Sequence, residues 1–447
     1  MNTSRILIAL VACVTLIQGC ALTRVDSHAE QRFQESTVGQ PTYYVDYAGF
    51  GLPADTLSRL EIYYQVFNFG LQFKQSESEF SADFVFSVRV RDSEGEQVKS
   101  LEQERNVRVA NYEATQSRFD YRTSQINFDL PTGKYTIETT LRDVGSGQII
   151  NRDFAITLGG FRQGQPVASD IMFVQAAQAR TTESGVFDKG NMTVVPSVTR
   201  LYGGEDSTRL LYYFEIYRGS DSAEQVNVET ILRSQSRGMI YRDTLWVDLA
   251  EAVTRQLRNI SLAEYSPGDY TLEVLLRGRR NKRLDQKDET FTIQWSQEAL
   301  LKHDFNTAVE QLSYIAASNE YEDMKKLQTM EEKIRAFNAF WDARDPTIGT
   351  RENESKREFY RRVTFANRQF RHMRRDGWRT DRGRIYIQFG EPDQIDDHPI
   401  SPEYPPYQIW HYYREGRYRR FTFVDQNEDG DFRLQFPYDG LNQRPDF

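Results

Sequence analysis

Three acidic residues near the C-terminus, Asp381, Glu391 and Asp393, could perform acid/base chemistry. Glycoside hydrolases use a pair of carboxyl groups, one as the acid and the other as the base or nucleophile. Acidic residues in turns are more often solvated, and we expect that outcome here. Hydrolysis of a glycan is therefore kept as the alternative function.

A second acidic pattern resembles a calcium loop. The run Asp425–Asp431 has oxygen-bearing side chains at positions 1, 3 and 5 and a glycine, Gly430, at position 6. Position 12 would be Phe436, where calcium loops have a bidentate glutamate. We therefore expect an acidic β-hairpin turn and no metal site.

Other common catalytic patterns are missing from the sequence. The chain has two cysteines and five scattered histidines, and it lacks an HExxH motif, a nucleophile elbow and a glycine-rich phosphate loop. The sequence thus gives no indication of zinc, serine-hydrolase or nucleotide chemistry, and we expect no cofactor. A protein that is not an enzyme is the preferred interpretation.

A basic segment precedes the acidic one. Between Ser355 and Arg384 lie eleven Lys or Arg residues and three acids, within a chain of net charge −9. The arginines could pair internally with Glu391, Asp393, Asp396, Asp397 and Glu403. The alternative is that Arg368, Arg371 and Arg375 form a docking surface for an acidic partner or an anionic polymer.

The composition sets the scale of the elements that must position these residues. The chain has 447 residues, of which 39% are hydrophobic and 27% are charged, a globular composition. Its length predicts three domains. The 25 tyrosines and 28 phenylalanines favour β-sheet, and the acidic balance argues against nucleic-acid binding.

The N-terminus predicts export. Residues 1–19 combine a short basic start with an apolar run, Ile6–Gly19, that is too short to span a bilayer. The run ends in Leu-Ile-Gln-Gly before Cys20, which resembles a bacterial lipoprotein box. The resemblance implies cleavage before Cys20 and its acylation, and Ala21 implies the outer membrane. An ordinary signal peptide or an uncleaved anchor is the alternative. Residues 20–42 are polar and predict a tether.

Two stretches, residues 43–160 and 168–295, show the alternating pattern of half-buried strands. They share a signature in which a turn with Pro and Gly leads to a tyrosine, Tyr135 or Tyr270, and to a Leu-Arg pair beyond it. The pattern resembles the late hairpin of immunoglobulin-like domains. We expect two tandem immunoglobulin-like β-sandwiches that arose by duplication, with one large β domain as the alternative.

The period changes to that of helices after Trp295. Residues 296–350 predict a helical linker region, with a capping box at Thr329–Glu332. A longer amphipathic helix is predicted from Ser355 to Arg375, with a second capping box at Ser355–Glu358 and Gly377 at the C′ position.

The segment Gly377-Trp378-Arg379-Thr380-Asp381 and the sequence around it resemble the GWxTD domain, a bacterial envelope family. The resemblance spans about residues 295–436. The matching motif residues are Gly377, Trp378, Thr380, Asp381, Gly383, Gly390, Pro392, Asp393 and Trp410. The resemblance implies a place in the cell envelope, but it implies no defined biochemical activity.

Residues 351–447 are expected to form an α+β domain with an antiparallel sheet. Ile385, Ile387 and Phe389 alternate with polar residues, which predicts a strand. Trp378 is expected to fill the seam between helix and sheet, while Thr380 and Asp381 bond to turn amides.

The sequence as a whole predicts a lipid-anchored protein of the outer membrane that faces the periplasm. In this interpretation two sandwiches hold the C-terminal domain away from the membrane. The domain acts as a binding or structural module for an envelope protein or an anionic polymer.

Overall fold

The computed structural model describes most of the chain after residue 40. The described ranges are 41–52, 56–76, 79–117, 120–161, 164–181, 185–203, 209–219, 224–234, 238–266, 268–294, 305–347, 353–372, 375–398, 404–414 and 417–436. No helix within these ranges is long and apolar enough to cross a membrane. The signal peptide and the acylation of Cys20 fall outside them.

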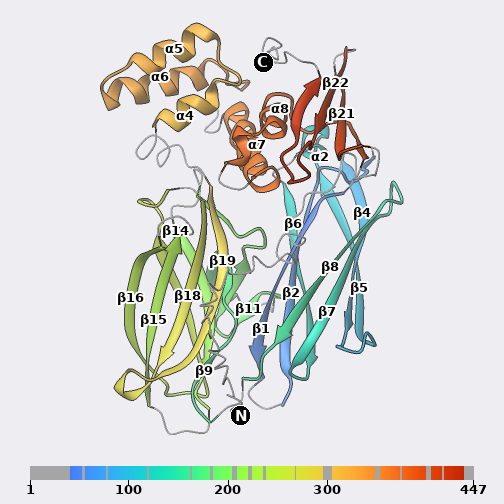
Figure 1. The fold of residues 1–447 in the computed structure, drawn as a ribbon. Helices are drawn as coiled ribbons and strands as arrows, with labels where there is room; N and C mark the ends of the chain where they lie inside the picture. The colour runs from blue at the N-terminus through green and yellow to red at the C-terminus, as the bar shows by residue number, and fades with distance from the viewer. Residues whose placement is uncertain are drawn as a thin grey trace, which may run out of the picture.

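The first β-unit, residues 43–158, consists of two antiparallel sheets that share one core (Figure 1). One sheet has the order β1 (Tyr43–Gly51), β2 (Ser58–Phe67), β6 (Tyr121–Leu130). The other has the order β8 (Ile149–Leu158), β7 (Gly133–Asp143), β4 (Phe80–Arg91), β5 (Gln97–Val109). A short strand, β3 (Lys74–Gln75), pairs with β4, and a one-turn helix, α2 (Tyr112–Thr115), follows β5.

The second β-unit, residues 167–294, is built in the same way around its own core. One sheet has the order β11 (Asp188–Lys189), β12 (Met192–Pro196), β10 (Met172–Ala179), β14 (Arg209–Tyr217), β17 (Val253–Ser261), with β9 (Val167–Ala168) also on β14. The other has the order β13 (Leu201–Gly203), β19 (Arg283–Gln294), β18 (Gly268–Arg277), β15 (Gln225–Ser234), β16 (Gly238–Asp248). A short 3₁₀ turn, η1 (Arg279–Asn281), joins β18 to β19.

The two β-units repeat one topology. The order β1-β2-β6 corresponds to β10-β14-β17, and β8-β7-β4-β5 corresponds to β19-β18-β15-β16. The signature tyrosines occupy equivalent places at the start of β7 and β18. The Tyr135 hydroxyl donates to the carbonyl of Pro131, and the Tyr270 hydroxyl donates to that of Ser266, four residues upstream in each case.

The C-terminal part combines helices with a four-stranded antiparallel sheet. The helices are α4 (Phe305–Leu312), α5 (Ser318–Lys326), α6 (Met330–Asp342), α7 (Glu354–Gln369), the 3₁₀ turn η2 (Gly377–Arg379) and α8 (Asp381–Phe389). The sheet has the order β20 (Gln394–His398), β21 (Tyr407–Arg414), β22 (Arg417–Val424), β23 (Arg433–Phe436). The protein is therefore β-rich with a C-terminal antiparallel sheet, as predicted.

Helices α4, α5 and α6 share one hydrophobic core with α7. Phe305 of α4, Trp341 of α6 and Phe359 of α7 all belong to it. The segment predicted as a helical linker therefore forms part of the C-terminal fold. The capping box at Thr329–Glu332 is confirmed at the start of α6, where each side chain bonds to the backbone amide of the other residue.

The strand predicted at Ile385–Phe389 is wrong, because these residues form α8. Thr380 is the N-cap of α8, and the helix is buried on two sides. Ile387 packs into the helical core, whereas Ile385 and Phe389, four residues apart, pack against the sheet. Because α8 is buried on two sides, its apolar residues Ile385, Ile387 and Phe389 fall at alternate positions. This spacing is also the period of a strand, so the pattern alone does not distinguish the two structures.

The predicted boundaries of α7 also need correction. Asn353, not Ser355, is the N-cap, because its side chain accepts from the Lys356 amide at 2.9 Å. The helix ends at Gln369, and Phe370 rather than Gly377 follows it.

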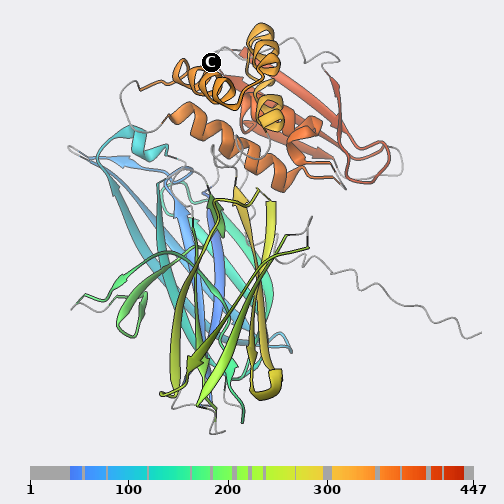
Figure 2. The same cartoon turned by 90° about the vertical axis from the view of Figure 1, so that its left-hand side faces the viewer.

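The C-terminal helices and sheet lie across one end of the paired β-units (Figure 2). Strand β1 starts at that end and runs away from it, since its last residue, Gly51, bonds to Tyr217 at the far end of β14 (Figure 1). The C-terminal part contacts the second β-unit at the start of β18, where Arg371 and Asp269 pair at 3.5 Å. The β-units therefore do not lie between the start of β1 and the C-terminal part.

Candidate functional site

The glycines of the motif allow three backbone segments to touch. A Cβ atom on Gly377 would lie 1.8 Å from the carbonyl oxygen of Ala366 in α7. A Cβ atom on Gly383 would lie 1.9 Å from the carbonyl oxygen of Gly377. Neither position has room for a side chain, so both glycines are required for α7, η2 and α8 to pack as closely as they do.

Thr380 links η2 to α8 through its hydroxyl group. Oγ1 donates to the Gly377 carbonyl at 2.7 Å and accepts from the Gly383 amide at 3.1 Å. The second bond is that of an N-cap residue, which satisfies an amide that has no partner within the helix. Thr380 therefore bonds to a backbone amide, as predicted, but the amide lies in the first turn of α8 and not in a connecting turn.

Trp378 is only 3% exposed, and it lies in the helical core. Its ring meets that of Tyr314 edge to face at 5.9 Å, and its amide donates to Asn367 Oδ1 at 3.0 Å. The predicted position in the seam between helix and sheet is wrong. The sheet side of α8 is instead filled by Trp410, which is 1% exposed.

Two of the three candidate carboxylates, those of Asp381 and Asp393, are tied to different strands. Asp381 Oδ2 accepts from the Leu434 amide on β23 at 3.0 Å, and Asp393 Oδ2 accepts from the Tyr413 amide on β21 at 2.6 Å. Leu434 pairs with Phe423 of β22, and Phe423 pairs with Gln408 of β21. Gln408 lies five residues before Tyr413 on β21, so the amides of Leu434 and Tyr413 are about 17 Å apart along the strand direction. That separation is too large for the carboxyl pair of a glycosidase.

The residues after α8 complete the turn into the sheet. Gly390 has a φ of 75°, and its carbonyl oxygen accepts from the Tyr412 hydroxyl at 3.0 Å. Pro392 is buried, and the Asp393 amide donates to the His411 carbonyl at 2.8 Å. Glu391 follows Gly390, and its carbonyl oxygen accepts from Arg414 at 2.8 Å.

The acidic run after β22 is a hairpin turn. Asp425 accepts from the amides of Asp429 and Gly430, at 3.2 and 2.7 Å, so its carboxylate closes the turn. Within the described residues, no group of three or more His, Cys, Asp or Glu side chains could hold a metal ion.

The arginines of the basic segment make internal ion pairs, but mostly not with the predicted acids. The pairs are Arg361 and Arg362 with Glu358, Arg371 with Asp269, Arg375 with Asp431, Arg379 with Glu310, and Arg384 with Asp381. Two residues of the predicted docking surface, Arg371 and Arg375, thus hold parts of the chain together. The side chain of the third, Arg368, lies outside the described part.

Arg382 is partly buried beside two aromatic rings. Its guanidinium group lies 4.1 Å from the ring centre of Phe432 and 5.2 Å from that of Phe370. Burial lowers its pKa to about 10, although Asp425, Asp397 and Asp431 act in the opposite direction.

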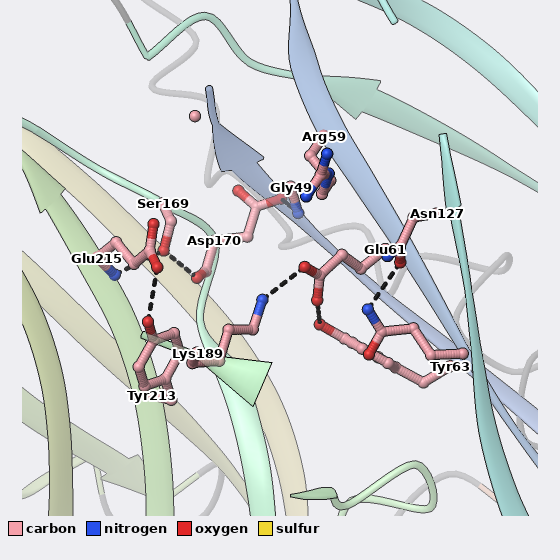
Figure 3. Close-up of polar contacts among 12 residues, drawn as sticks. Gly49, Arg59, Glu61, Tyr63, Asn127, Ser169, Asp170, Lys189, Tyr213 and Glu215 are labelled. Atoms are coloured by element: carbon pink, nitrogen blue, oxygen red, sulfur yellow. Dashed lines mark hydrogen bonds and ion pairs between the residues drawn. The ribbon is translucent and has the colours of Figure 1, made fainter. Parts of the chain in front are cut away.

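A second polar cluster lies between the two β-units, and the sequence analysis missed it (Figure 3). Lys189 of β11 donates to Glu61 of β2 at 2.5 Å, and its ammonium group lies 3.6 Å from the ring centre of Phe50. Glu61 also accepts from the Tyr63 hydroxyl at 2.7 Å. Asp170 of the second unit accepts from the Gly49 amide of the first at 2.8 Å.

A further buried ion pair joins the units. Asp46 accepts two hydrogen bonds from Arg200, both 2.7 Å long, and the Arg200 side chain is 3% exposed. On the second unit, Glu215 accepts from Tyr213 and Tyr217, both at 2.6 Å. Burial, together with the Glu215 charge, raises the pKa of both tyrosines well above its ordinary value.

Apolar residues surround these polar groups. Those from the first unit are Tyr44, Ala48, Phe50 and Tyr63, and those from the second are Met172, Val174, Val194, Val198 and Tyr213. The signal in the sequence was that β1 carries mostly apolar residues on both of its faces, which indicates a strand covered on both sides. The partners themselves are more than 100 residues apart, and no local pattern joins them.

The model of the GWxTD domain family matches residues 286–437. This chain contains a GWxTD domain. The match covers about a third of the chain and begins within β19, so the GWxTD domain includes α4–α6 as well as the pentapeptide and the sheet.

Solved structures resemble the chain only weakly. A glycosyl hydrolase family 2 member from Bacteroides cellulosilyticus is 8% identical with a TM-score of 0.20, over 52% of this chain and 27% of that one. A Bifidobacterium dentium β-glucuronidase is 11% identical with a TM-score of 0.20, over 52% of this chain and 39% of that one. The putative ApaA protein from Bordetella pertussis is 10% identical with a TM-score of 0.19, over 27% of this chain and 97% of that one.

These similarities are too low to carry an argument about function. This chain spans only 27% and 39% of the two hydrolases. A search of curated proteins gave no match.

Proposed function

We propose that the protein is a lipid-anchored component of the bacterial cell envelope that acts as a binding or structural module. The observation that carries this proposal is that residues of the GWxTD motif serve the packing of the domain. Gly377, Trp378, Thr380, Gly383 and Trp410 are all buried and hold helices and sheet together. A motif used in this way supports a scaffold that presents a surface, not a reaction centre.

The proposal includes the outer membrane as the location, with the domain facing the periplasm, and the membrane as a partner through the lipid on Cys20. It also includes two immunoglobulin-like sandwiches. The equivalent hydrogen bonds of Tyr135 and Tyr270 support this part, because tyrosines that bond a few residues upstream recur at the corners of immunoglobulin-like sandwiches.

Glycan hydrolysis has less support, because Asp381 and Asp393 are held at separate places in the domain. Replacement of Asp381 or Asp393 by asparagine distinguishes a structural role of the carboxylate from a catalytic role. A structural role predicts that Asp381→Asn lowers the melting temperature, whereas a catalytic role predicts an unchanged melting temperature and loss of turnover.

Fatty-acid labelling in cells tests the anchor. The wild-type protein is expected to incorporate labelled fatty acid and to fractionate with the outer membrane, because buried acyl methylenes provide its membrane affinity. Cys20→Ser should incorporate no label. Cys13→Ser is the matched control, since cleavage before Cys20 removes Cys13 and labelling should not change. Label on the Cys20→Ser protein would contradict the proposal.

A further inference from the structure

Strand β16 forms one edge of the second β-unit. It pairs with β15 on one side, and no other strand of the described residues pairs with its second side. This edge lies on the side of the molecule away from the first β-unit (Figure 1). An edge strand presents a row of backbone amide and carbonyl groups that can pair with another chain. The eleven residues of β16 are therefore open to strand addition.

The side chains of β16 are apolar for an exposed edge. Met239, Leu245 and Trp246 are 52%, 51% and 58% exposed, and no other helix or strand of the described part has three exposed large apolar residues. Strand β5 forms the equivalent edge of the first β-unit, and its five charged residues discourage pairing. They are Lys99, Glu102, Glu104, Arg105 and Arg108. The edge of β16 lacks this protection.

The charges of β16 decide how it can pair with the same strand of a second copy. In a pair with two-fold symmetry the strands run antiparallel, and a residue at the axis directly opposes its own counterpart. Like charges that directly oppose each other are destabilising, which excludes an axis at Arg242 or at Asp243. An axis at Tyr241 or at Thr244 opposes no charge with an opposite one. An axis beyond Leu245 pairs five residues at most, because β16 ends at Asp248.

An axis at Leu245 makes β16 complementary to itself. Residues 242–248 of the two copies then pair, and the two half-exposed Leu245 side chains meet at the axis. Arg242 of each copy directly opposes Asp248 of the other, which gives two pairs of opposite charge. The remaining pairs are Asp243 with Val247 and Thr244 with Trp246, where the small threonine leaves the tryptophan ring open to solvent.

We infer that the protein forms a two-fold dimer in which β16 of each copy pairs around Leu245. The pairing joins the sheet β13-β19-β18-β15-β16 of one copy to that of the other in a single continuous sheet. Because the paired strands are antiparallel, the two GWxTD domains lie at opposite ends of the dimer. The inference goes beyond the proposed function, since it concerns a surface of the second β-unit and does not depend on the lipid anchor.

The mass of the full-length protein in detergent solution, measured by sedimentation, tests the dimer. The wild type should have twice the mass of the monomer. Leu245→Lys sets two ammonium groups against each other at the axis and should halve that mass. Leu101→Lys is the matched control, because Leu101 is a 40% exposed leucine on the equivalent edge strand β5. A monomeric wild type, or a variant Leu245→Lys that stays dimeric, would overturn the inference.

Disulfide cross-linking tests the register and does not require the dimer to be broken. Leu245→Cys should form a covalent dimer on mild oxidation, because opposed Cα atoms in an antiparallel pair are about 4.5–5.5 Å apart, within the range of a disulfide. Met239→Cys is equally exposed on the same strand, but its two copies would lie about 40 Å apart and should not link. The wild type controls for Cys13 and Cys20. No link through Leu245→Cys, or an equal link through Met239→Cys, would overturn the inference.

Discussion

Gly377 and Gly383 explain why two glycines flank the Thr-Asp pair of the GWxTD domain. Each faces a backbone carbonyl oxygen of another segment at a distance that excludes a Cβ atom. Their φ values are not the reason, since neither lies in the left-handed region. The requirement comes from the close approach of α7, η2 and α8.

Alanine at Gly377 should therefore unfold or strongly destabilise the GWxTD domain. The new methyl group would overlap the Ala366 carbonyl, and the backbone must move to accept it. We expect a loss of more than about 3 kcal/mol in the free energy of unfolding, measured by urea denaturation. Gly133→Ala is the control, because its Cβ atom would meet no atom closer than 3.5 Å. Equal stability of the two variants would contradict the assignment.

Trp378 is expected to contribute through burial. Replacing it by alanine should destabilise the domain by about 3–5 kcal/mol, as truncation of large core residues does. Trp246 of β16 is 58% exposed, so Trp246→Ala should change stability by less than about 0.5 kcal/mol. A melting temperature for Trp378→Ala equal to that of Trp246→Ala would show that the ring is not part of the core.

At the scale of elements, α8 shows where sequence reasoning ends. The alternation of Ile385, Ile387 and Phe389 fits the period of a strand. The segment is nevertheless a helix, which Thr380 caps and which is buried on two sides. The capping box of α6 could be predicted, because its two residues are three apart and make their bonds locally. The same reasoning missed the Lys189–Glu61 pair, whose members are 128 residues apart.

Helix α7 carries a local charge cluster that makes stability depend on pH. Burial opposes ionisation of Glu358, but Arg361 and Arg362 outweigh it and lower the pKa to about 2 from 4.5. Because the pKa is lower in the folded state, the ionised carboxylate stabilises the domain above about pH 4.5. That contribution is lost as the pH falls toward 2.

Glu358→Gln should remove this contribution. We expect it to lower the free energy of unfolding by about 2 kcal/mol at pH 7, after allowance for partial exposure, and by much less near pH 3. Glu331→Gln is the control, since Glu331 and Arg335 are 85% and 74% exposed. A difference between Glu358→Gln and the wild type that stays constant from pH 7 to pH 3 would exclude the ion pairs as its cause.

At the scale of the whole molecule, the two β-units form one support. The faces of the two units that meet are joined by apolar packing and by the buried pairs Lys189–Glu61 and Arg200–Asp46. The GWxTD domain lies at the end where β1 starts.

The Lys189–Glu61 pair tests whether the β-units act as one body. The exposed fractions of its side chains are 8% and 6%, so Lys189→Ala leaves a buried carboxylate without its counter-charge. We expect a loss of about 3–5 kcal/mol in urea unfolding of the full chain. The neutral double variant Lys189→Met/Glu61→Gln should recover most of it. Arg59→Ala breaks a pair whose members are 39% and 40% exposed, and should cost about 0–1 kcal/mol. If Lys189→Ala cost no more than Arg59→Ala, the pair would be open to water and the two units free to separate.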